Sequence, residues 1–438
     1  MQVDKVTLQD IGLFDNEESK GLITHLNYCK TNGGTELFEK FLSQPLSSQK
    51  AILIRQQALA IYIQQLQFWE SMKITNGSTL VIDKFFETSF ENIPAQISVP
   101  GAYLFRFLNK SDFSLLKYSV EHLVTFYQNL HQWVTLFEVQ TENATIEALV
   151  HKVKRLLAHP ALSNIHAESA LNNPQSILSL ANFFIYQYRN NTRTLLECFY
   201  EIDAYYSMAT AIKTHHFEFP TWVESTTPLF EVEAALHPLV KDPVHNSITL
   251  SRESNLLFLT GANMAGKSTF IKTIGIVLYL AHIGMGAPAK KIKLSLLDGL
   301  ITNLTIADNV VKGESYFFNE VQRIKNTIEK ISDGKKYFVL IDELFKGTNI
   351  QDAMKCSIKV IAGLQKLRTS LFVISTHLYE ISDELKSYPN IQFSYFETEI
   401  KEKDLVFHYQ LRKGISADRI GYLLLERQGV VAMLDELA

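Results

Sequence analysis

Hydrophobic residues recur at helical spacing over most of the first half of the chain, from about residue 19 to residue 214. In TELFEKFLSQPL (residues 35–46) the apolar side chains fall on one helix face, and Pro45 ends the run. The longer stretches 115–137 and 176–212 repeat the same period over lengths typical of packed helices. This half therefore predicts an all-α domain.

The second half follows a different pattern. Pro220 and Pro228 interrupt the helical period, and after them short apolar runs alternate with amphipathic segments. The runs Leu256–Leu259, Tyr337–Ile341 and Leu371–Ser375 are typical of strands buried on both faces. Such alternation predicts a mostly parallel sheet covered by helices, with any chemistry at the carboxyl ends of the strands.

Length and composition fit two domains, an all-α domain in residues 1–219 and an α/β domain in residues 220–438. Apolar residues make up 46% of the chain, enough for a large core. No run approaches the roughly 20 apolar residues of a membrane span, and the N-terminus lacks the pattern of a signal peptide. We therefore expect a cytoplasmic protein.

Charge and cysteine content narrow the chemistry further. The net charge of −4 does not favour extensive nucleic-acid binding, so any DNA contact is expected from local patches. Cys29, Cys198 and Cys356 lie far apart and form no metal-binding spacing. They predict neither a disulfide framework nor a zinc site.

The stretch FLTGANMAGKSTFIK (258–272) carries the clearest chemical signal. It places G-x-x-x-x-G-K-S between a predicted strand and a predicted helix, which is the pattern of a phosphate-binding loop and disfavours a chance strand-to-helix turn. Lys267 is expected to reach the β- and γ-phosphates of a nucleotide, and the Ser268 hydroxyl to bind Mg²⁺. The predicted ATP-binding residues are Gly261, Ala262, Asn263, Met264, Ala265, Gly266, Lys267, Ser268 and Thr269.

A second signal lies in KKYFVLIDELFKGTN (335–349), an apolar strand that ends in two acids. Asp342 is expected to hold Mg²⁺, and Glu343 to polarise the attacking water. An apolar run before two acids is common by itself. Its place downstream of the predicted phosphate-binding loop favours the catalytic interpretation.

Two further residues leave alternatives open. His377 follows the third predicted strand, where it is either an ordinary polar residue or a sensor of the γ-phosphate; the neighbouring acids favour the sensor. Ser315 precedes a predicted helix, and the residues alone do not decide whether it caps that helix or binds an anion.

These motifs, in their order and spacing, resemble the ATPase domain of the MutS family of DNA mismatch-repair proteins, itself an ABC-type ATPase. The resemblance rests on LHPLV (236–240), TGANMAGKSTF (260–270), GMGAPAKK (284–291), KGESYFFNEV (312–321), LIDELFKGTN (340–349), STHLYEIS (375–382) and YQLRKGISADRIGYLLLERQGV (409–430). Residues 14–59 and 200–211 are similar to the start of the family's helical core and to its lever helix.

The resemblance implies a composite ATP site shared by two chains, either a homodimer or a pair with a related MutS-like partner. Ser315 would then act in trans on the partner's ATP, and His377 would be the family's switch histidine. ATP and Mg²⁺ are the implied cofactors. Two residues depart from the family pattern, Tyr316 in place of threonine and Lys346 in place of arginine, and both put the rate or the coupling of the dimer in doubt.

The family's mismatch-reading parts are not expected in this chain. The core-like segment begins near residue 14, which leaves no room for the mismatch and connector domains, and we expect the clamp and the C-terminal helix-turn-helix to be missing too. Three Phe-x-Glu triplets resemble the family's wedge motif but fall in the helical half, so we interpret them as packing residues or solvated helix faces: 68–70, 85–87 and 199–201. DNA contacts are therefore expected to the backbone or to shape.

The resemblance implies an ATPase that uses ATP to switch DNA-binding helical arms, in mismatch repair or a related pathway. A different class of protein stays open, an ATP-switched module that grips a protein or ribonucleoprotein partner. A transporter-type ABC ATPase is disfavoured because the chain has no membrane span and KGESYFFNE differs from a transporter signature.

Overall fold

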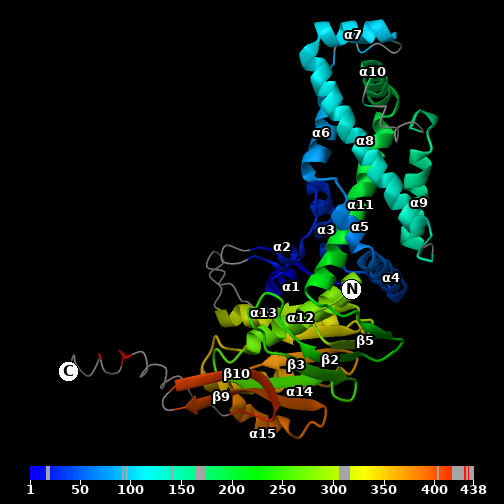
Figure 1. Ribbon diagram of the computed structural model, residues 1–438. Helices are drawn as coiled ribbons and strands as arrows, with labels where there is room; N and C mark the ends of the chain where they lie inside the picture. Colours follow the sequence, from blue (N-terminus) through cyan, green and yellow to red (C-terminus); the bar gives the residue numbers. More distant parts are fainter. Residues whose placement is uncertain are drawn as a thin grey trace. The chain divides into compact units, whose positions relative to one another are not determined.

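The computed structural model describes residues 1–15, 20–90, 93, 97–139, 142–162, 171, 173–304, 316–401, 404–416, 429–430 and 433. The chain divides into two compact units (Figure 1). One, called the sheet unit here, contains residues 1–25, 45–52 and 215–438. The other, the helical unit, contains residues 26–44 and 53–214.

The helical unit is built from long helices, as the apolar period predicted. Their bounds are α3 (Asn32–Ser43), α4 (Gln49–Gln64), α5 (Leu66–Ser71), α6 (Asn76–Glu87), α7 (Val99–Leu108), α8 (Lys110–Glu138), α9 (Ala144–Leu157), α10 (Pro174–Asn182) and α11 (Arg189–Thr214). The run predicted over residues 176–212 is not one helix. A five-residue π-helical turn, Phe183–Gln187, separates α10 from α11.

Helix α11 supplies much of this unit's core and its main buried acid. Asp203 is fully buried and accepts hydrogen bonds from the Thr31 N–H at 2.9 Å, the Thr31 hydroxyl at 2.6 Å and the Lys30 N–H at 2.9 Å. A Cβ at Gly34 would lie 2.2 Å from the Asp203 carboxylate, so only glycine fits there. These contacts fix the start of α3 on α11.

The three Phe-x-Glu triplets lie in helices, as the sequence predicted. Two of their phenylalanines, Phe85 and Phe199, are 2% and 0% exposed. Phe68, the phenylalanine of the first triplet, is half-buried, and the neighbouring Trp69 is 3% exposed. Trp69 stacks on Tyr206 with ring centroids 4.4 Å apart. The rings of Phe85 and Phe199 are therefore not available to stack on a base.

The sheet unit holds two sheets. The larger has the strand order β10-β9-β4-β8-β7-β6, and the smaller has the order β1-β5-β2-β3. Strand bounds are β1 (Thr221–Val223), β2 (Leu229–Ala235), β3 (Asn246–Ser251), β4 (Leu256–Gly261), β5 (Lys291–Ser295), β6 (Gly299–Asn303), β7 (Tyr337–Ile341), β8 (Leu371–Ser375), β9 (Ile391–Lys401) and β10 (Asp404–Lys413). The three predicted strands are present as β4, β7 and β8.

The strands of the larger sheet are parallel except for the pair at one edge, β9 and β10. Strand β4 pairs in parallel with β8 and β9, β7 pairs in parallel with β8 and β6, and β9 pairs antiparallel with β10. Helices α12 (Lys267–Ile283), α13 (Tyr316–Ile331) and α14 (Ile350–Leu364) connect the strands. The protein thus mixes helix and sheet. Within the described residues no helix is long and apolar enough to cross a membrane.

The first residues of the chain pack in the sheet unit, although the sequence grouped them with the helices in residues 1–219. Gln2 donates to the Asp298 carbonyl at 2.6 Å and accepts from the Leu300 N–H at 3.0 Å, so it bridges the edge of β6. Asp10, at the end of α1 (Lys5–Asp10), accepts from the Thr302 hydroxyl at 2.7 Å. The helical period of a sequence can show that a helix such as α1 has a buried face. It cannot show which element packs against that face.

Candidate nucleotide-binding site

The glycine-rich loop connects β4 to α12, and its two glycines are required by their backbone conformation. Gly261 has a φ of +139° and Gly266 a φ of +105°, both in the region that L-residues avoid. A Cβ at Gly266 would lie 3.2 Å from the Tyr409 ring, and one at Gly261 3.2 Å from the Phe396 carbonyl. Helix α12 begins directly after Gly266, so its free N–H groups face the loop.

Lys267 is held inside this loop. Its side chain is only 5% exposed, and Nζ donates to the carbonyls of Gly261 at 2.8 Å and Ala262 at 2.9 Å. Burial lowers the pKa of Lys267, while the charges of Asp342 and Glu343 oppose that shift. The ammonium therefore lies between the loop carbonyls and within electrostatic reach of both predicted acids.

The acidic pair follows β7 and is tied to the neighbouring strand β8. The Ser375 hydroxyl donates to the Asp342 carboxylate and accepts from the Glu343 N–H at 3.0 Å. The Asp342 N–H donates to the Asn303 carbonyl at 3.0 Å. Sequence reasoning overlooked Ser375; its place two residues before His377, on a strand predicted beside the acids, was the available signal.

Glu343 lies at the centre of a small polar cluster. One carboxylate oxygen is 2.8 Å from His377 Nε2 and the other is 2.5 Å from Lys346 Nζ. The bond to His377 and then the contact with Lys346 lower the pKa of Glu343 to about 2, against the opposing effect of burial. Glu343 is therefore a carboxylate at neutral pH, and the structure places it beside His377.

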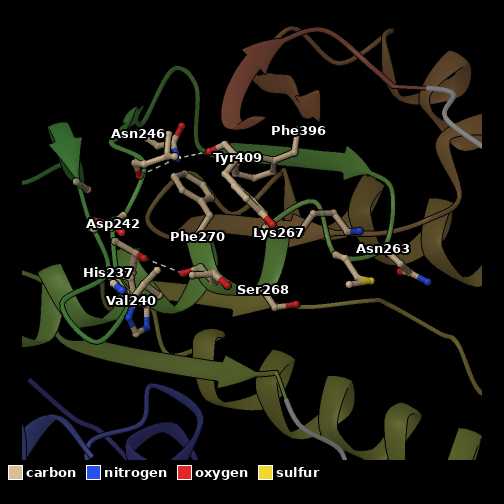
Figure 2. A pocket seen from close by; sticks show the side chains of 18 of the residues that line it. His237, Val240, Asp242, Asn246, Asn263, Lys267, Ser268, Phe270, Phe396 and Tyr409 are labelled. Carbon is tan, nitrogen blue, oxygen red and sulfur yellow. Dashed lines mark hydrogen bonds between the residues drawn. The ribbon is translucent and has the colours of Figure 1, made fainter. Parts of the chain in front are cut away.

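A cavity of about 530 Å³ opens beside the glycine loop (Figure 2). Asn263, Lys267, Ser268 and Glu343 contribute to its wall. The opposite wall comes from the segment 237–246 between β2 and β3, and from Phe396 and Tyr409 on the last two strands. The cavity thus combines the polar groups of the loop with an exposed aromatic ring, Tyr409, that packs close to Gly266. Apolar and aromatic walls with a few polar groups are typical of ligand sites.

Tyr409 is the most exposed aromatic ring of this cavity, at 45%. It occupies a bulge in β10 with a φ of +53°. Asn246 holds the bulge from β3, donating to the Tyr409 carbonyl at 3.0 Å and accepting from the Leu411 N–H at 2.7 Å. The sequence did not single out Tyr409 or Asn246, because nothing local marks a bulge clamped by a distant amide.

His237 lies at the base of the same cavity and is a neutral imidazole. Burial, with a smaller effect from Lys272, lowers its pKa to about 4. Its Nδ1 accepts from the Leu239 N–H at 3.3 Å, so the histidine also shapes the turn after β2. The sequence showed this residue only as part of the motif LHPLV.

The predicted site residues from β4, β7 and β8 are therefore gathered at one edge of the parallel sheet. Ser268 and Asp342 supply hydroxyl and carboxylate oxygens, the ligand types that Mg²⁺ takes together with water and phosphate. Their chemistry fits the ion. Ser315, predicted to act across a dimer, lies outside the described residues.

The region that carries these residues is similar in sequence to known proteins. Residues 257–431 match the family model "MutS domain V". A DNA mismatch repair protein MutS from Petrotoga mobilis is 25% identical over 287 residues, which cover 65% of this chain and 34% of that protein. The MutS of Bacillus subtilis is 28% identical over 53% of this chain and 27% of its own length. The mismatch repair protein msh3 of Aspergillus oryzae is 27% identical over 54% and 22%.

The chain thus spans about a third or less of the length of these curated relatives. The matched residues 257–431 contain the glycine loop, the acidic pair and His377, with the strands that carry them. Through this region the chain is similar to MutS-family proteins.

Proposed function

We propose that this protein is a MutS-type ATPase that binds ATP with Mg²⁺ and hydrolyses it to ADP and phosphate. The observation that carries the proposal is the convergence of Lys267 and Ser268 with Asp342, Glu343 and His377 beside one cavity edge, within the MutS domain V match. The domain organisation belongs to the same proposal: the helical unit would be the core and lever, and the sheet unit, which also takes in residues 1–25 and 45–52, would be the ABC-type ATPase domain.

The phosphates would be bound by the backbone N–H groups of residues 261–269 and by the N-terminus of α12. Lys267 would exchange the carbonyls of Gly261 and Ala262 for the β- and γ-phosphate oxygens. This exchange replaces two neutral acceptors by charged ones, which strengthens each hydrogen bond of the ammonium. Ser268 and Asp342 would hold Mg²⁺, which neutralises charge on the phosphates.

Glu343 would accept the proton of the attacking water, and His377 would orient that carboxylate and sense the γ-phosphate. The two side chains are already in contact at 2.8 Å. Because Lys346 occupies the second carboxylate oxygen, it must move or share that oxygen when water binds there. The base would stack on Tyr409, whose exposed ring lines the cavity close to Gly266.

In this proposal two copies, or one copy and a related MutS-like chain, share each ATP, with Ser315 contributed in trans. ATP binding would switch the helical arms on DNA through backbone or shape contacts, in mismatch repair or a related maintenance pathway of the cytoplasm. The match of residues 257–431 to MutS domain V and the names of the relatives support this proposal.

ATP turnover by the purified chain, with and without Mg²⁺, tests the enzymatic part. Lys267→Ala is expected to lower turnover about 100-fold or more, because it removes the cation at the phosphates. Lys290→Ala is the matched control, since that lysine is 77% exposed on the same unit. Equal turnover in both variants would remove Lys267 from its role.

A titration at stated salt with homoduplex, mismatched and branched DNA, with and without ATP, tests the nucleic-acid part. We expect ATP-dependent binding to at least one of these DNAs. Absence of binding to all three at moderate salt would contradict DNA binding and favour a protein or ribonucleoprotein partner. Equal affinity for homoduplex and mismatch would contradict mismatch recognition alone.

A further inference from the structure

We propose that Glu320 is a positioning residue for ATP hydrolysis, which acts from helix α13 by holding the backbone that carries Lys346 against Glu343. The inference rests on the proposed function, because it concerns the placement of the carboxylate proposed to activate water. Glu320 itself does not contact the cavity.

Glu320 is a buried carboxylate with a specific use. Its side chain is 3% exposed. One of its oxygens accepts the N–H of Lys346 at 3.2 Å, and the other accepts the N–H of Gly347 at 3.1 Å. A buried charge is costly unless it is paired or hydrogen-bonded, and here two consecutive backbone donors serve that purpose.

The segment that Glu320 holds is conformationally unusual. Glu343 has a φ of +53° and Phe345 a φ of +59°, and neither is glycine. Such conformations are unfavourable for residues other than glycine and persist only where the surroundings impose them. From α13, Phe317 adds a ring contact to Phe345 with centroids 5.8 Å apart. Helix α13 therefore anchors this turn through a bidentate hydrogen bond and an aromatic contact.

Lys346 links the anchor to the reacting group. Its backbone N–H is bound by Glu320, and its Nζ lies 2.5 Å from the Glu343 carboxylate. The N–H of Glu343 is fixed from the other side by Ser375 at 3.0 Å. With Glu320 in place, the turn between residues 343 and 347 is held at both ends. Without it, the Lys346 end can relax and the carboxylate loses its fixed direction.

The experiment compares Glu320→Gln and Glu320→Ala with Glu329→Gln, a control on the same helix whose side chain is 64% exposed. We expect kcat for ATP to fall about tenfold or more in both Glu320 variants, with KM within twofold, because the phosphate-binding loop lies on other elements. A KM that rises as strongly as kcat falls, or an unchanged kcat, would overturn the inference. Glu329→Gln should match the parent protein.

A double-mutant cycle with Glu343→Gln separates positioning from general damage. If Glu320 acts only through Glu343, Glu320→Gln should lower kcat no further in the Glu343→Gln background. A full additional loss of tenfold would show a merely structural role and overturn the inference.

Backbone amide exchange provides a readout that does not depend on activity. In Glu320→Gln, the amides of Lys346 and Gly347 should exchange at least tenfold faster while the β4 amides keep their protection. This result would support the anchor even if the parent chain showed no ATP turnover, an outcome that contradicts the proposed function alone. Unchanged exchange at both amides would overturn the anchor.

Discussion

The glycine loop and the acidic turn meet at the same cavity edge but are shaped by different forces. In the loop at residues 261–266, two of the three residues with positive φ are glycines, which such conformations suit; the third is Met264, with a φ of +67°. Helix α12 begins directly after the loop. In the turn at residues 342–347, Glu343 and Phe345 adopt left-handed conformations that do not suit them. Side chains from distant elements hold that turn in place.

This difference suits the two tasks proposed for the site, ATP binding by the glycine loop and hydrolysis by the acidic turn. A phosphate-binding loop needs backbone N–H groups in a fixed curve, which a few local residues can supply. The acidic turn needs a carboxylate held in one direction, which takes contacts from several strands and helices. We therefore expect local substitutions to damage ATP affinity, and substitutions in the acidic turn to damage turnover.

The largest expected effect is that of Glu343→Gln. The amide keeps the size of the side chain but cannot accept the proton of water, so kcat should fall 100-fold to 10,000-fold, on the order expected for a general base. ATP affinity should stay within threefold. Turnover in a single-turnover assay, with ATP affinity measured in parallel, checks this expectation; retained turnover would remove Glu343 from its role.

For Gly266→Ala in the glycine loop we expect a loss of ATP affinity rather than a loss of kcat. The φ of +105° is unfavourable for alanine, and the added Cβ would lie 3.2 Å from the Tyr409 ring. ATP affinity should fall about thirtyfold, corresponding to ~2 kcal/mol. The matched control is Gly363→Ala in α14, where a Cβ would meet no atom within 4 Å. Equal affinities in the two variants would contradict a conformational requirement at Gly266.

Tyr409→Ala tests whether the ring of Tyr409, which strand β10 places beside the glycine loop, contributes to ATP binding. Loss of the exposed ring should weaken ATP binding about tenfold, since stacking of a base on an aromatic ring contributes ~1–3 kcal/mol. Tyr409→Phe retains the ring and should bind ATP as the parent does. Unchanged affinity of Tyr409→Ala in equilibrium titration would show that the base lies elsewhere.

The last expected effect is on stability rather than on ATP, and it concerns His282 in the last turn of α12, which is fully buried. Burial lowers its pKa to about 4, while the unfolded chain keeps an ordinary value near 6.5. The unfolded state therefore binds more protons below pH 6.5, and the free energy of unfolding should fall between pH 6.5 and pH 4, by at most ~1.4 kcal/mol per pH unit.

Chemical denaturation of His282→Gln across this range checks the expectation. In the variant, the free energy of unfolding should change less steeply with pH than in the parent protein. His245→Gln, at an exposed position of the same unit, should retain the slope of the parent protein. An identical slope in all three proteins would contradict the assignment of a buried neutral imidazole to His282.

The sequence alone predicted the elements whose signals are local. Apolar runs gave β4, β7 and β8 their places, and the helical period predicted the long helices of the other unit. It did not predict the π-helical turn before Tyr188, because the apolar period continues through it. Nor did it predict that α1 packs beside β6, since periodicity reports a buried face but not its partner.

For the candidate site, the sequence determined which groups are present: a glycine loop with Lys267, two acids and a strand-end histidine. The tertiary structure decided how those groups are held. Ser375 and Glu320 are remote from the acidic turn in sequence, and Asn246 is remote from Tyr409. Their contacts follow from strand order and helix placement, which depend on the packing of the whole unit rather than on neighbouring residues.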